Sequence, residues 1–89
     1  MRDRKELKEC ISLIKDRLKE PGMSDPKNSS VKAGYEKSIE ILKQKATNSK
    51  GMGIEYLKTT QSRAIAMLAI DFVNGDITKD LLLSVPLKK

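Results

Sequence analysis

The sequence predicts an all-α fold: a compact bundle of three helices plus a short C-terminal helix, in one domain spanning residues 1–89. Three segments repeat apolar residues every three or four positions, the spacing that places them on one face of a helix. Stretches rich in proline, glycine and asparagine separate these segments. The chain has 89 residues, which is the size of a single domain.

The first helix is predicted over residues 4–20. Its apolar residues fall on one helical stripe: Leu7, Cys10, Ile11, Ile14 and Leu18. Charged residues of both signs lie between them and indicate a solvated face. Pro21 cannot extend the helix and Gly22 accepts a left-handed exit, so this pair predicts its end.

The second helix is predicted over residues 30–47. Its stripe runs through Val31, Tyr35, Ile39, Leu42 and Ala46. Asp25 and Pro26 precede it and are typical of a helix entry, with an acceptor at the N-cap and proline at the first position. Two glycines in the stretch 48–53 predict the turn that follows.

The third helix is predicted over residues 54–74, and its second half is apolar nearly all round. A helix that is apolar on every side is normally buried on every side. Gly75 is the expected C-cap. A short fourth helix is predicted over residues 78–85, with Thr78 as N-cap and Pro86 limiting its end.

The composition favours a homo-oligomer in a reducing compartment. Aromatic residues make up only 3% of the chain, so the core must be built mainly from aliphatic side chains. Small domains with such thin cores often gain stability by self-association. A single cysteine, Cys10, allows no intramolecular disulfide, and the charged N-terminal residues do not resemble a signal peptide. We therefore expect a cytoplasmic protein.

The residue inventory argues against an enzyme. The chain has no histidine, the commonest general base near neutral pH, and its lone cysteine therefore has no imidazole partner. Cys10 lies on an apolar stripe and is interpreted as a core thiol. No group of acidic residues offers enough oxygen ligands for a metal ion. We expect no catalytic residues, no metal and no cofactor.

The first interpretation of function is a small, non-enzymatic interaction or regulatory protein. It would self-associate through the third helix and bind another macromolecule, with a protein as the expected partner. The candidate apolar contacts are Ile65, Met67, Ile70 and Val73. Gln61 and Arg63 would form the polar edge, because arginine is preferred in interface ion pairs.

The alternative interpretation is a basic module that binds nucleic acid or a small phosphorylated or nucleotide ligand. The chain carries 18 basic and 12 acidic residues, a net charge of +6. The candidate cations are Lys43, Lys45, Lys50, Lys58 and Arg63. The excess is spread along the sequence, with net charges of +2, +3 and +1 over residues 1–20, 21–50 and 51–89. Five acids among the bases of residues 1–20 argue against a membrane partner.

Overall fold

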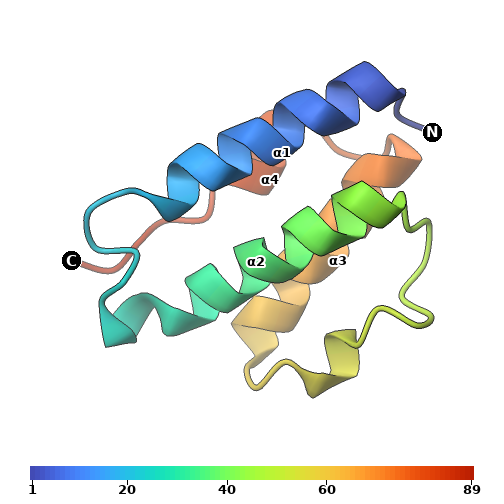
Figure 1. The fold of residues 1–89 in the computed structure, drawn as a ribbon. Helices are drawn as coiled ribbons and strands as arrows, with labels where there is room; N and C mark the ends of the chain where they lie inside the picture. Colours follow the sequence, from blue (N-terminus) through green and yellow to red (C-terminus); the bar gives the residue numbers. More distant parts are fainter.

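The computed structural model describes all residues from 1 to 89 and confirms the all-α prediction. Its helices are α1 (Arg4–Leu18), α2 (Ser29–Gln44), α3 (Thr60–Asn74) and α4 (Lys79–Leu83). Two short 3₁₀ turns, η1 (Pro26–Asn28) and η2 (Ile54–Tyr56), precede α2 and α3. Helices α1 and α2 form one layer, with α3 behind α2 and α4 behind α1 (Figure 1). None of the helices has the length and apolarity needed to cross a membrane.

The helix ends are fixed by side-chain and glycine caps. Asp3 accepts a hydrogen bond from the backbone N–H of Glu6 at the start of α1. Gly75 ends α3 in the left-handed conformation, with φ at 82°, as the sequence predicts. Thr78 caps α4 by accepting from the N–H of Leu81, which confirms the predicted N-cap. These caps satisfy backbone groups that the helices themselves leave free.

The predicted start of the third helix is wrong by six residues. Residues 54–56 form the turn η2, and α3 begins only at Thr60. Thr59 is the N-cap, because its hydroxyl accepts from the N–H of Ser62 and the Ser62 hydroxyl pairs back to the cap. Ile54 is nevertheless buried, so the apolar pattern before Thr59 marks burial rather than helix.

Other predicted helix ends also move inward. The second helix ends at Gln44 rather than at residue 47, because Lys45 turns into the left-handed region with φ at 53°. The first helix ends at Leu18 and the fourth spans only residues 79–83. Asp25 caps the turn η1, whose first residue is Pro26, so this predicted entry leads into a 3₁₀ turn before α2.

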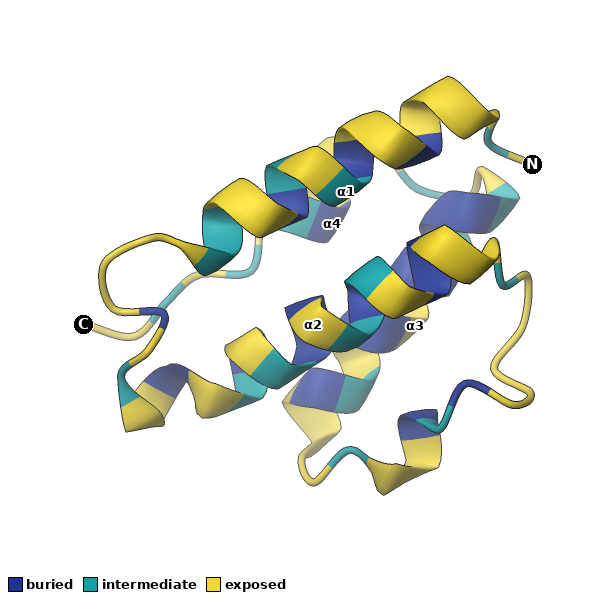
Figure 2. Cartoon of the chain, viewed as in Figure 1, coloured by how far each residue is buried: buried dark blue, intermediate teal, exposed yellow.

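A single core joins the four helices. It contains 17 buried apolar residues, and Figure 2 shows the buried faces turned towards the centre of the bundle. Cys10 is fully buried, as predicted. Helices α2 and α3 lie close together at Gly34, where an added Cβ would lie 2.7 Å from the Cβ of Ile65.

Two arginines at opposite ends of α1 bind the C-terminal part of the chain. Arg2 donates to the carbonyl oxygens of Phe72 (3.2 Å) and Ile77 (2.5 Å). Arg17 donates to the carbonyl oxygens of Leu83 and Val85. Helix α1 is therefore attached to segments that lie more than 60 positions away in the sequence.

Candidate anion-binding face between α1 and α2

Most of the exposed basic residues of α1 and its C-cap lie on one side of the helix. Four basic residues share one side, at spacings of 4, 7 and 4: Arg4, Lys8, Lys15 and Lys19. At 100° per residue these positions fall within about 60° of one another. Three acidic residues lie further round the helix: Glu6, Glu9 and Asp16. The basic side borders α2, and the acidic side turns towards α4, where Glu9 meets Lys79.

A cleft of about 390 Å³ lies between the basic side of α1 and the C-terminal end of α2. Its rim carries four cations, defined here as the cationic rim: Arg4, Lys8, Lys43 and Lys45. Its floor is apolar and formed by Leu7, Ile11 and Leu42. No acidic residue lines this cleft, so its electrostatic potential is set by like charges.

The cationic rim has no partner within the chain. The five ion pairs of the molecule all involve other cations. None of the four rim side chains lies within 4.0 Å of a carboxylate, and all four residues are exposed. Lys5 adds a further charge, because it lines an adjoining depression together with Arg4 and Lys8. The face therefore offers an uncompensated positive field to a ligand.

Lys45 holds its rim position in an unfavourable backbone conformation. Its φ of 53° lies in the left-handed region, and it is the one residue other than glycine with positive φ in the chain. Helices usually place glycine at such a position, because a Cβ there costs about 1–2 kcal/mol. The chain thus retains a lysine where glycine would make a more stable helix end, which is typical of functional positions.

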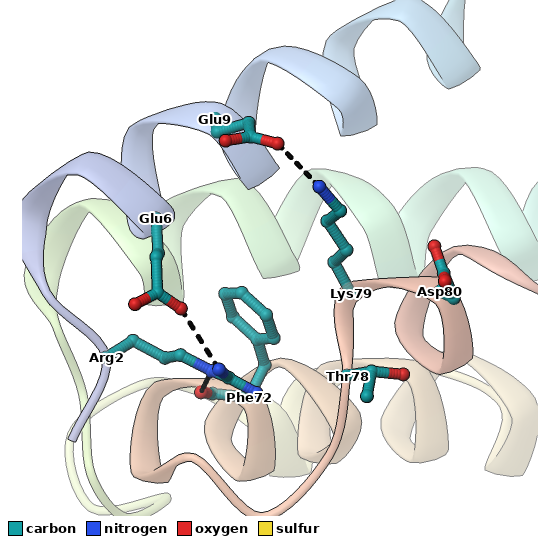
Figure 3. A pocket seen from close by; sticks show the side chains of 7 residues that line it. All are labelled: Arg2, Glu6, Glu9, Phe72, Thr78, Lys79 and Asp80. Carbon is teal, nitrogen blue, oxygen red and sulfur yellow. Dashed lines mark hydrogen bonds and ion pairs between the residues drawn. The ribbon is translucent and has the colours of Figure 1, made fainter.

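A second cleft, of about 310 Å³, lies between α1 and the α3–α4 connection and has a different character (Figure 3). Glu9 and Lys79 pair across it at 2.5 Å, and Arg2 pairs with Glu6 at 3.0 Å. The hydrogen bond and charge of Lys79 lower the pKa of Glu9, and Glu9 in turn raises the pKa of Lys79. The Arg2 guanidinium also lies 4.7 Å from the centre of the Phe72 ring. The Glu9–Lys79 ion pair, together with the hydrogen bonds of Arg2 to Phe72 and Ile77, holds α1 on the α3–α4 connection, so we assign this cleft a structural role.

The structure brings together two of the five cations predicted for anion binding. Lys43 and Lys45 both lie on the cationic rim. Lys50 is exposed in the loop after α2, and Lys58 lines another cleft beside Ser29, at the opposite end of α2. Arg63 donates to the carbonyl oxygen of Leu57 at 2.6 Å and so stabilises the turn before α3.

The residues predicted for self-association divide between core and surface. Ile65, Ile70 and Val73 are at most 3% exposed within the single chain, which corrects the expectation that they face a second copy. They are covered because α2 packs along α3, with further contacts from α4, more completely than the sequence indicates. Met67 is 40% exposed, and Gln61 is also exposed.

Arg4 and Lys8 lie on the cationic rim but are not among the cations predicted from the sequence. Lys8 belongs to the solvated face of mixed sign that the sequence indicates, and its spacing of four from Arg4 places both residues on one side of the helix. What the sequence alone could not supply is the contact between this side and the end of α2.

Comparisons with protein-family models, with curated proteins and with solved structures found no match to this chain. Function is therefore inferred from the surface chemistry of the molecule.

Proposed function

We propose that the protein binds the phosphate backbone of double-stranded nucleic acid through the α1–α2 face, independently of base sequence. The observation that carries this proposal is the cationic rim, whose four charges have no partner in the chain. Phosphate contacts from lysine and arginine supply most of the affinity of such complexes and carry no direct sequence information.

The extent of the basic surface favours a polyanion over a small anion. The 15 residues of α1 span about 22 Å, and its basic side carries cations from Arg4 to Lys19. Duplex DNA presents one charge per ~1.7 Å of axis, so it can meet all of these cations at once. The floor of the cleft is largely buried, with Leu7 and Leu42 at 3% and 1% exposed, and offers little apolar area to a protein partner.

The positions of the aromatic residues favour a duplex over a single strand. Proteins that bind single strands stack bases on exposed aromatic rings. Tyr35 and Phe72 are buried, and Tyr56 lines the cleft at the opposite end of α2 from the cationic rim. The α1–α2 face thus has charge for a backbone but no platform for bases.

The test is fluorescence anisotropy with a labelled DNA duplex of mixed sequence, titrated at several salt concentrations. With about four phosphate contacts, we expect affinity to fall about 100-fold between roughly 50 and 200 mM salt. The double variant Lys8→Gln/Lys43→Gln should lower the slope of log affinity against log salt by about 2, because each lost phosphate contact lowers it by about 1.

The matched control is Lys50→Gln/Lys58→Gln, which removes the same charge away from the rim. Its salt slope should stay close to that of the wild-type protein. Equal losses in both double variants would show that net charge alone drives binding. Absence of binding at the lowest salt would reject the proposal.

Self-association through α3, with a regulatory protein partner, is the weaker proposal. It is supported only by the 40% exposure of Met67, since the other apolar candidates are buried in the chain's own core. Light scattering tests it directly. A dimer that Met67→Asp converts to a monomer would support it, and an unchanged mass would exclude this contact.

A further inference from the structure

Residues Val85–Lys89, defined here as the strap, cross the loop between α1 and α2 (Figure 1). No backbone–backbone hydrogen bond joins the strap to the rest of the protein. Val85 and Leu87 are half-buried against the core, whereas Pro86 and Lys88 are exposed. Half-buried and exposed side chains thus alternate along the strap, as they do in an extended peptide that lies in a groove.

Side chains from the body of the protein grip the strap by its backbone. Asn28 is fully buried; its Nδ2 donates to the carbonyl oxygen of Lys88 at 2.9 Å, and its Oδ1 accepts from the N–H of Lys88 at 2.7 Å. Arg17 donates to the carbonyl oxygen of Val85 at 2.5 Å. The strap is thus held much as a peptide-binding protein holds the main chain of its ligand.

The gripping residues are themselves held in place. Asn28 Nδ2 also donates to the carbonyl oxygen of Gly22 at 3.0 Å, which fixes the orientation of the amide. Arg17 lies over the Tyr35 ring, 5.5 Å from its centre, and pairs with Glu20 at 3.4 Å. A side chain that is already oriented loses little entropy when it binds a ligand.

We propose that the groove formed by Arg17, Gly22 and Asn28 is a binding site for an extended peptide of a partner protein, and that the strap is its displaceable resident. The strap itself defines the chemistry of the partner. It is an extended segment with apolar side chains at two alternate positions, the second followed by lysine. Leu87 supplies the second apolar position and lies over Gly22, where an added Cβ would be 4.0 Å from the leucine Cδ1.

Displacement is feasible because three side-chain hydrogen bonds and two half-buried side chains are all that hold the strap. A tethered strap competes at an effective concentration of about millimolar, so a free peptide binds the intact protein weakly. Weakening the strap without touching the groove should therefore strengthen binding of a peptide supplied in trans. This site uses none of the cationic rim, so its test is independent of nucleic-acid binding.

The experiment measures fluorescence anisotropy of a labelled peptide with the sequence of residues 84–89, Ser-Val-Pro-Leu-Lys-Lys, on the full chain. The Leu87→Asp variant damages the strap and leaves the groove residues intact. We expect it to bind the peptide at least about tenfold more tightly than the wild-type protein does, because the resident competitor is weakened. If Leu87→Asp lowers the helical circular dichroism signal, the Leu87→Ser variant is used in the same experiment.

Two controls address the groove itself. A probe peptide with aspartate in place of its leucine should not bind, and this control needs no protein variant. Adding Asn28→Ala to Leu87→Asp should abolish binding of the normal peptide. Equal affinities of the wild-type and Leu87→Asp proteins for the peptide, or no binding to either, would overturn the proposal. A wild-type dimer that Asn28→Ala converts to a monomer would assign the groove to the strap of a second copy instead.

Discussion

Replacing Gly34 by alanine is expected to destabilise the protein, although local helix propensity favours the change. Gly34 lies in the middle of α2, where alanine would stabilise an isolated helix by about 1 kcal/mol. In the bundle, the added Cβ would lie 2.7 Å from the Cβ of Ile65 and 3.0 Å from its Cγ2 and Cδ1 atoms. Ile65 is branched at Cβ and 1% exposed, so no change of rotamer removes this clash.

Helices α2 and α3 must therefore move apart, and overpacking of this kind costs about 1–3 kcal/mol. Because the clash involves the Cβ of Ile65, which no rotamer change can move, we place the cost in the upper half of this range, about 2–3 kcal/mol. After the gain of about 1 kcal/mol in propensity, we expect a net loss of about 1–2 kcal/mol in the free energy of unfolding. For a domain of this size that lowers Tm by about 5–15 °C.

The assay is urea and thermal unfolding followed by circular dichroism at the helical band. Ala33→Gly, one residue earlier, is the matched control. It measures the difference in helix propensity between alanine and glycine in α2, and we expect it to lower the free energy of unfolding by about 1 kcal/mol. If Gly34→Ala proves as stable as the wild-type protein or more so, α2 and α3 do not approach this closely in solution and the reasoning fails.

Two further expectations concern pH and the helix end. Burial raises the pKa of the Cys10 thiol from 9.0 to about 11. Between those pH values the unfolded chain loses this proton while the folded chain keeps it, so the free energy of unfolding should fall as pH rises, by roughly 2–3 kcal/mol in all. Urea unfolding at several pH values checks this, and Cys10→Ala should lose this pH dependence. Lys45→Gly should raise the free energy of unfolding by about 1 kcal/mol, because glycine adopts positive φ without strain. The same variant should lower the salt slope of DNA binding by about 1, and an unchanged slope would remove Lys45 from the binding face.

Periodicity predicts the helices of this protein better than their ends. The stripes of α1 and α2 and the apolar second half of α3 follow from spacing, because burial on one side of a helix selects those positions. The same signal misleads before Thr59, where Ile54 is buried on a 3₁₀ turn. Periodicity does not explain Gly34. The reason for a glycine inside α2 becomes apparent only in the packed α2–α3 interface, where a Cβ would clash with Ile65.

The candidate site shows a similar division. Lys43 and Lys45 were predicted from composition, but their partners on α1 are more than 30 positions away in the sequence. The net charge of a segment does not show that its cations share one face of the molecule. Acidic and basic residues are interspersed along the sequence of α1, and most of the bases come to lie on one side only in the helix. Asn28 lies just before the second helix as predicted from the sequence, and nothing in the neighbouring residues indicates that its amide binds Lys88.

The attachments of Arg2 and Arg17 determine when α1 can reach its final place. Arg2 binds carbonyl groups 70 and 75 positions later in the sequence, and Arg17 binds groups 66 and 68 positions later. During synthesis, α1 is made before these segments and thus completes its packing only after Val85 has been added. Contacts so distant in sequence form late in folding, whereas the neighbouring helices α2 and α3 can pair earlier. Until then, the stripe of Leu7, Cys10 and Ile14 lacks part of its cover, so partly folded chains expose apolar surface that can aggregate.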